Sequence, residues 1–131
     1  MGRFEIFASV FVVLRGPSGE PLLRTTELDG ELACRAAIME IRLNATVRER
    51  FQRRASAHGG RYFVLMDPFG DALGFSPLFD SRSGCEHAVA TTMGCAEHAV
   101  VVRATRMARA GDAVQTTVEA RRDRWINGNR S

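Results

Sequence analysis

Two of the three cysteines and two of the three histidines lie within residues 84–102, which read GCEHAVATTMGCAEHAVVV. Thiolate sulfur and imidazole nitrogen are the usual zinc ligands, and a cysteine in an electropositive, partly exposed position can act as a nucleophile. The segment therefore raises two chemical hypotheses, a metal site and a reactive thiol.

The spacing of these residues disfavours a metal site. Cys85 and His87 are two residues apart, which on a helix separates their side chains by about 200°, so both cannot bind one ion. Cys95 and His98 are three apart and could pair across a helix end, but two ligands do not close a structural zinc site. We therefore expect no metal, with Cys95 and His98 as the remaining candidates.

The thiol hypothesis depends on exposure. Cys85 falls in the first turns of a predicted helix near Arg82, where a thiolate would be favoured. Its helix face is shared with small apolar residues, however, which predicts a buried, inert side chain. Cys95 follows Gly94 at the predicted helix end, and of the two it is the thiol that we expect to be exposed.

No catalytic constellation emerges from the remaining residues. His58 lies in the turn SAHGG and His87 on a predicted helix, and we expect both to be solvated. The turns GPSG and DPFG lack the extra glycines and the Lys-Ser/Thr pair of a phosphate loop, and no serine stands in a nucleophile elbow. We therefore expect a protein that is not an enzyme, with no catalytic residues and no cofactor.

An internal repeat organises the elements that carry these residues. Residues 10–45 align without a gap on residues 61–96, an offset of 51, with nine identities in 36 positions. The identical pairs include Gly19/Gly70, Asp29/Asp80, Cys34/Cys85, Val13/Val64 and Leu14/Leu65. Two copies of one supersecondary unit are the economical interpretation.

Each copy begins with a predicted hairpin. β-Branched and aromatic residues are followed by GPSG or DPFG, in which proline presets φ and glycine accepts a positive φ. The predicted strands are residues 10–14 and 20–25 in the first copy, and 61–66 and 71–76 in the second.

A helix follows each hairpin. Asp29 and Asp80 stand where an N-cap would be, and Ser83 with Glu86 could form a capping box in the second copy. Apolar or small residues then recur with a period of 3.6. The predicted core faces are Cys34, Ala37, Ile38, Ile41 and Ala45 in one helix, and Cys85, Ala88, Val89, Thr92 and Ala96 in the other.

Three further strands complete the pattern: FEIFAS near the start, residues 47–56, and residues 99–103. The order is three strands, one helix and one strand, twice over, with the repeats spanning about 3–51 and 51–103. The strand at 47–56 is counted in both copies, because it ends the first and begins the second. This predicts one α+β domain over residues 1–103, with both helices on one face of a shared antiparallel sheet.

Four segments resemble the YegP-like family of small tandem-repeat proteins, which is classed as a domain of unknown function: FEIF, FVVLRGPSGEPLL, RERFQRRASAHGGRYFVLMDPFGDALG and FDSRSGCEHAV. The resemblance covers residues 3–103. It implies one sheet shared by two repeats, the final strand of each swapped toward the other, and helices on one side. The family has no established activity to imply.

The chain departs from the family at its turns and helices. GPSG and DPFG replace the usual Ala-Asn-Gly, and the Asn-Gly pair inside each helix is absent, since Ala36 and Ala37, and His87 and Ala88, occupy those positions. Any role of the family's Asn-Gly positions therefore does not carry over.

The net charge of +3 lies entirely in a basic C-terminal tail, residues 104–131, which has six arginines against three acidic residues, while residues 1–103 carry twelve of each. Three interpretations of the tail stay open. It could be disordered, or it could form an amphipathic docking helix through Val114, Val118 and Trp125. It could also bind nucleic acid, with arginines contacting phosphates and the indole stacking on a base. The residues of that contact would be Arg106, Arg109, Arg121, Arg122, Arg124 and Trp125.

The composition suggests a compartment and a function class. Three cysteines are an odd number, and without a recognisable secretory signal they favour reduced thiols in the cytoplasm. No apolar run reaches the roughly 18 residues of a membrane span, so we expect no membrane partner. All 18 basic residues are arginine. This could reflect recognition of phosphate or carboxylate groups, but the arginines are spread evenly along the chain, which favours the effect of a GC-rich genome, and we expect a bacterial source. We expect a soluble, non-enzymatic interaction module whose sheet edge or face meets a protein or a second copy; the alternative is weak nucleic-acid binding through the tail.

Overall fold

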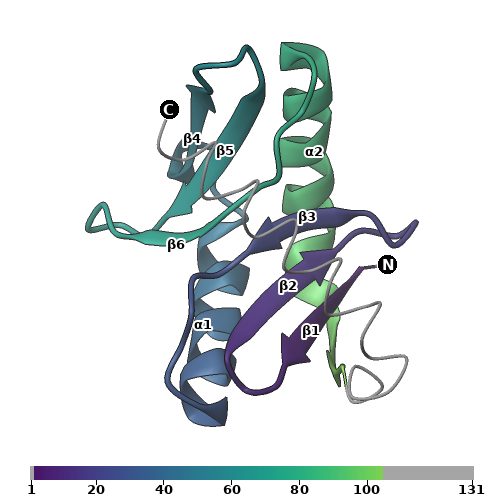
Figure 1. The fold of residues 1–131 in the computed structure, drawn as a ribbon. Coiled ribbons are helices and arrows are strands. Elements are labelled where there is room, and N and C mark those ends of the chain that lie inside the picture. Colours follow the sequence, from purple (N-terminus) through teal and green to yellow (C-terminus); the bar gives the residue numbers. More distant parts are fainter. Residues whose placement is uncertain (1, 105–131) are drawn as a thin grey trace.

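The computed structural model describes residues 2–104, which form one seven-stranded sheet and two helices (Figure 1). The elements in chain order are β1 (Arg3–Phe7), β2 (Phe11–Arg15), β3 (Pro21–Arg24), α1 (Glu31–Asn44), β4 (Phe51–Ala55), β5 (Arg61–Met66), β6 (Ala72–Phe75), α2 (Arg82–Cys95) and β7 (Val100–Arg103). Short 3₁₀ turns, Arg48–Arg50 and Ala96–His98, precede β4 and β7. The predicted helices and strands are therefore all present, with small shifts at their ends.

The sheet is mixed, with strand order β4-β5-β6-β3-β2-β1-β7. Neighbouring strands run antiparallel except β1 and β7, which are parallel. The prediction of a wholly antiparallel sheet is thus wrong at this edge. β7 follows α2, and a strand that enters a sheet after a helical crossover can lie parallel to its neighbour. The short apolar run at 99–103 contains nothing that specifies its partner or direction.

The two halves of the chain are interlocked. β3 and β6 pair at the centre of the sheet, with Arg24 opposite Phe75. β4 follows the first helix but pairs with β5, and β7 follows the second helix but pairs with β1 (Figure 1). A single strand, β4, therefore closes the first half and opens the second.

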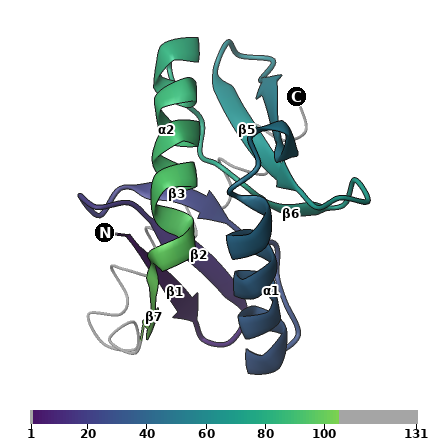
Figure 2. The same ribbon diagram turned by 180° about the vertical axis from the view of Figure 1, so that it is seen from behind.

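Both helices lie on the same face of the sheet, behind it in Figure 1 and in front of it in Figure 2. They bury the faces that the sequence predicted, with Cys34 and Cys85 each at most 2% exposed. The inward side chains of the strands meet them in one core, which includes Phe4, Ile6, Leu14, Ile38, Ile41, Phe63, Leu65 and Val89.

Equivalent backbone contacts recur 51 residues apart. The N–H of Val12 donates to Oγ1 of Thr25 at 3.0 Å, and the N–H of Phe63 donates to Oγ of Ser76 at 2.9 Å. Gly19 and Gly70 have φ of 83° and 90° in the two predicted turns. Both helices are 14 residues long.

The predicted helix caps are wrong. α1 begins after Gly30, which has φ of 100° and no side-chain cap, so Asp29 is not the N-cap. α2 begins after Ser81, whose Oγ accepts the N–H of Gly84 at 3.0 Å, so Asp80 is not the cap either. Each aspartate precedes the true cap by one residue. The Ser83–Glu86 capping box is absent as well, because Ser83 already lies inside the helix and Glu86 accepts hydrogen bonds from Arg53.

Candidate interaction surface

All three cysteines are free and buried. Burial raises the pKa of each thiol, most directly by desolvating the thiolate. The prediction that Cys95 is exposed is wrong, since it is only 7% exposed. A Cβ added to Gly2 would lie 3.0 Å from the Sγ of Cys95, so the backbone ahead of β1 lies against this thiol. None of the three thiols has the exposure and lowered pKa of a nucleophile.

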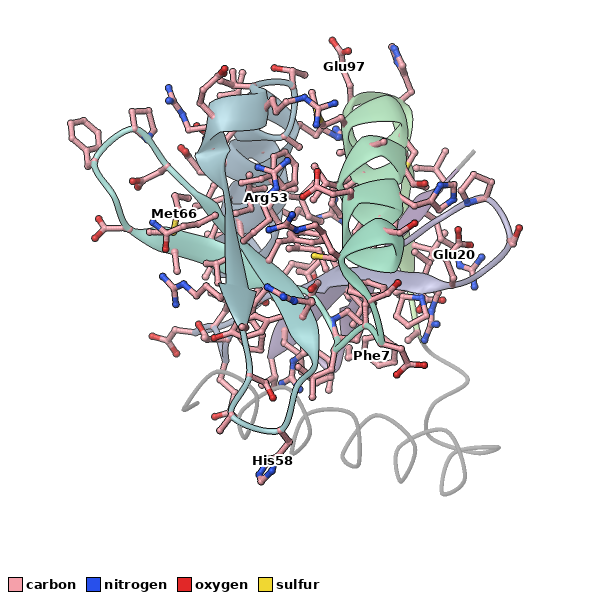
Figure 3. All side chains as sticks on the ribbon, turned by 90° about the horizontal axis from the view of Figure 1, so that it is seen from above. Phe7, Glu20, Arg53, His58, Met66 and Glu97 are labelled. Carbon is pink, nitrogen blue, oxygen red and sulfur yellow. The ribbon has the colours of Figure 1, made fainter. Side chains whose placement is uncertain are left out.

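The two residues suggested for a metal site are not brought together. The side chain of His98 is 73% exposed and lies 3.8 Å from a carboxylate oxygen of Glu97, whereas Cys95 is buried. Residues 2–104 contain no group of three or more His, Cys, Asp or Glu side chains placed to hold a metal ion. His58, at the tip of the β4–β5 hairpin (Figure 3), and His87 on α2 are exposed, as predicted.

Several arginines among residues 2–104 form ion pairs. Arg53 of β4 makes a bidentate bond to Glu86 of α2, with N···O distances of 2.6 and 3.0 Å. Glu31 binds both Arg35 and Arg103. These hydrogen bonds lower the pKa of both carboxyls. The arginines and Trp125 suggested for nucleic-acid contact lie outside the described residues.

The sheet edge at β4 is charged. Among residues 2–104, β4 pairs with β5 on one side only, and it carries Arg53 and Arg54. Charged side chains on an edge strand discourage pairing with another strand. The hypothesis that a sheet edge or face binds a partner therefore stays a prediction. The edge formed by β4 is poorly suited to such binding.

The largest gathering of exposed apolar side chains on one element is on α1. Of the six large hydrophobic residues that are exposed in the described part of the chain, three belong to this helix: Leu32 at 84%, Met39 at 63% and Leu43 at 68%. Ala36, also exposed, lies between them. We call these four residues the α1 seam.

The α1 seam runs along the outer side of the helix. Its members are at positions i, i+4, i+7 and i+11, so they share one face. At about 100° per residue, this face points away from the one that carries Cys34, Ile38 and Ile41 into the core. The outer sides of both helices face the viewer in Figure 2.

The second helix provides an internal comparison. The residues of α2 at the same positions are Ser83, His87, Ala90 and Gly94, which are polar or small. Of the two helices within residues 2–104, only α1 therefore carries an apolar seam. We did not predict it from the sequence, although the heptad spacing and the contrast with the aligned copy were both visible there.

Charges of opposite sign border the seam. Arg35 lies on one flank, 51% exposed, and bonds Glu31 one turn earlier at 2.9 Å. Glu40 lies on the other flank and is exposed. The outer face of α1 thus has an apolar centre and charged margins, the pattern of a surface that packs against another helix.

Comparison with solved structures identifies the fold. One match is the solution NMR structure of yegP from E. coli, a protein of unknown function, with a TM-score of 0.72 and 22% sequence identity over 78% of this chain and 91% of that one. The chain has the YegP fold. A UPF0339 protein from Shewanella oneidensis also has a TM-score of 0.72, with 18% identity over 78% of this chain and 90% of its own.

The YegP likeness confirms, at the level of fold, the resemblance inferred from the sequence. It brings no activity with it, because yegP is described as a protein of unknown function. No protein-family model matches the chain, and no curated protein matches it. No helix within residues 2–104 is long and apolar enough to cross a membrane.

Proposed function

We propose that this YegP-fold protein is a non-enzymatic interaction module of the bacterial cytoplasm that binds a protein partner through the outer face of α1. The observation that carries the proposal is the α1 seam, whose large members are 63–84% exposed. Burying apolar surface contributes about 25 cal/mol per Å², so a contiguous exposed row is a source of binding free energy. Exposed apolar patches with polar margins are typical of interaction sites.

The internal repeat supports this assignment. We infer that residues 3–51 and 51–103 are two copies of one β-β-β-α-β unit, because equivalent hydrogen bonds recur 51 residues apart. The outer residues of α2 then show which residue types the fold accepts at the same positions of α1. α2 packs in the same core with Ser83, His87, Ala90 and Gly94 on its outer side, so folding does not explain the leucines and methionine of α1.

The environments of the cysteines and histidines also favour a binding role over a catalytic one. The three thiols are buried with raised pKa values, and His58, His87 and His98 are exposed. An exposed histidine needs a polar partner that orients it before it can act as a general base. Three free cysteines also fit a reducing compartment.

The proposal is tested by cross-linking in the host cell. A photo-activated amino acid replaces Met39 in the α1 seam and, as a matched control, Ala90 at the aligned position of α2. We expect a discrete protein adduct from position 39 and none from position 90. Equal adducts from both positions, or none from position 39, would contradict an interaction role for this face.

Nucleic-acid binding through the tail is a second candidate, favoured by the location of the whole net charge of +3 in residues 104–131. We expect a gel shift at low salt that weakens as salt rises, because bound arginines release counterions. Deletion of residues 105–131 is the decisive comparison. A shift that survives this deletion, or that ignores salt, would rule the tail out.

A further inference from the structure

We propose that the α1 seam packs against the α1 seam of a second copy of this chain, with the two helices parallel about a two-fold axis. This inference rests on the proposed function and names its partner. It draws on the spacing of the seam, on the charges that border it, and on the contrast between the two helices.

The spacing of the seam matches that of an identical helix. Its residues are 4, 3 and 4 apart, so Leu32 and Met39 take one of the two apolar positions of a heptad and Ala36 and Leu43 take the other. This 3.5-residue repeat is the one with which two α-helices pack knobs into holes along their length. A helix with the same repeat is a complementary partner, and a second copy supplies one.

The bordering charges favour the parallel arrangement. Arg35 immediately precedes Ala36, and Glu40 immediately follows Met39, so they occupy the two flanking positions of the heptad. In a parallel pair these flanks face each other with an offset of five residues, which brings Arg35 of each copy beside Glu40 of the other. An antiparallel pair would instead set the Arg35 flank of each copy against the same flank of the other, away from Glu40, so this pair of opposite charges would not form.

The length of the seam sets the strength expected of the contact. The 14 residues of α1 span about 21 Å, and a stable interface buries roughly 800 Å² on each partner. A seam of this length covers only part of such an area. We therefore expect a reversible dimer with a Kd of about 10 μM or weaker, in the range of weak, small interfaces.

Sedimentation equilibrium of the full chain over a range of concentrations tests self-association. We expect a monomer–dimer equilibrium that Leu43→Gln weakens at least about tenfold, because a leucine that the dimer would bury is exchanged for a polar group. Ala90→Gln, the matched change on the outer side of α2, is expected to leave the equilibrium unchanged. Circular dichroism of both variants verifies that they fold. A chain that stays monomeric up to millimolar concentration would overturn the proposal.

Charge exchange tests the orientation. Arg35→Glu and Glu40→Arg each create like-charged flanks in a parallel homodimer, so each variant alone is expected to be more monomeric than the natural chain. An equimolar mixture restores both pairs of opposite charges and is expected to associate. Self-association of Arg35→Glu alone that is as strong as that of the natural chain would overturn the parallel pair.

A cross-link at one end of the helix gives an independent readout of orientation. In the parallel pair the two Leu32 positions face each other, whereas in an antiparallel pair they are separated by about 16 Å along the axis. We expect Leu32→Cys to form a disulfide-linked dimer on oxidation and Ser83→Cys, at the aligned position of α2, to stay monomeric. Absence of the Leu32→Cys dimer in a sample that sedimentation shows to be dimeric would contradict the parallel arrangement.

The experiments separate this inference from the proposed function. If the purified chain is monomeric but position 39 cross-links to another protein in cells, the seam is an interaction site and the second copy is the wrong occupant. A cross-link from position 39 to residues 105–131 of the same monomer would likewise overturn the inference, with the tail as occupant. If position 39 yields no adduct of any kind, the proposed function fails as well.

Discussion

The turn between β1 and β2 contains the only non-glycine residues with positive φ in residues 2–104. Ala8 and Ser9 have φ of 53° and 57°, and the N–H of Val10 donates to the carbonyl of Phe7 at 2.9 Å across them. An L-residue in this left-handed region costs roughly 1–2 kcal/mol. The turn between β4 and β5, which occupies the corresponding place in the second half of the chain, is longer and contains Gly59 with φ of 93°.

We predict that the double variant Ala8→Asn/Ser9→Gly raises the free energy of unfolding by about 1 kcal/mol, since Asn-Gly is the preferred pair where both turn residues have positive φ. Urea denaturation measures the change. The opposite change, Gly59→Ala, serves as the comparison and is expected to lower stability by about 1 kcal/mol. A Cβ at this position meets nothing within 4 Å, so only backbone strain contributes. A destabilised double variant would contradict the account.

At the scale of elements, hydrogen bonds donated by arginines connect the helices to strands and to the segments next to them. Arg53 joins β4 to α2 through Glu86, and Figure 3 shows Arg53 on the side of its strand that faces this helix. Arg42 joins α1 to the segment before β7, donating to the carbonyl of Ala99 at 2.6 Å. These contacts hold the two terminal strands of the sheet, each of which has one strand neighbour among residues 2–104.

The Arg53–Glu86 pair should make stability depend on pH. The hydrogen bond from Arg53 lowers the pKa of Glu86 in the folded state, so the pair stabilises the fold above the unfolded pKa of about 4.3. This contribution is lost as the pH falls through the folded value. Both side chains are a third or more exposed, which limits the contribution to about 1 kcal/mol or less.

We predict that Glu86→Gln lowers the free energy of unfolding at pH 7 by up to about 1 kcal/mol, and that the difference from the natural chain disappears in strong acid. Denaturation at a series of pH values measures both. Glu49→Gln, at another exposed glutamate, is the control and should have little effect at any pH. A loss that persists unchanged in acid would mean that Glu86 acts through packing rather than charge.

At the scale of the whole molecule, one core spans both halves of the chain. Ile38 of α1 and Val89 of α2 belong to the same cluster as Phe4 of β1 and Phe63 of β5. β7 lies beside β1 although about 90 residues separate the two strands in the sequence. Neither half can therefore bury its apolar surface without the other, and the two halves are not independent domains.

We predict a single unfolding transition for residues 2–104. Ile38→Ala in the first half and Leu65→Ala in the second should each lower stability by roughly 2–5 kcal/mol, and each should shift the unfolding of both halves equally. Amide exchange of the two halves, measured by NMR under partly denaturing conditions, distinguishes the possibilities. A variant that opened only its own half would contradict a shared core.

The sequence by itself determined the elements and their inner faces. Alternation and the 3.6-residue period placed the strands and helices, and the offset of 51 paired Cys34 with Cys85 on core faces that the structure buries. These features are local, because hydrophobic periodicity is imposed residue by residue by the geometry of strand and helix.

Only the tertiary structure decided the features that depend on distant segments. Cys95 is buried because Gly2 lies against it, and β7 runs parallel to β1 because α2 carries it to that edge. Leu32, Met39 and Leu43 are as apolar as the core residues of α1, so the helix has two apolar faces in sequence. Which face meets the sheet and which meets solvent is settled by packing between elements, and that assignment creates the seam on which the proposed function depends.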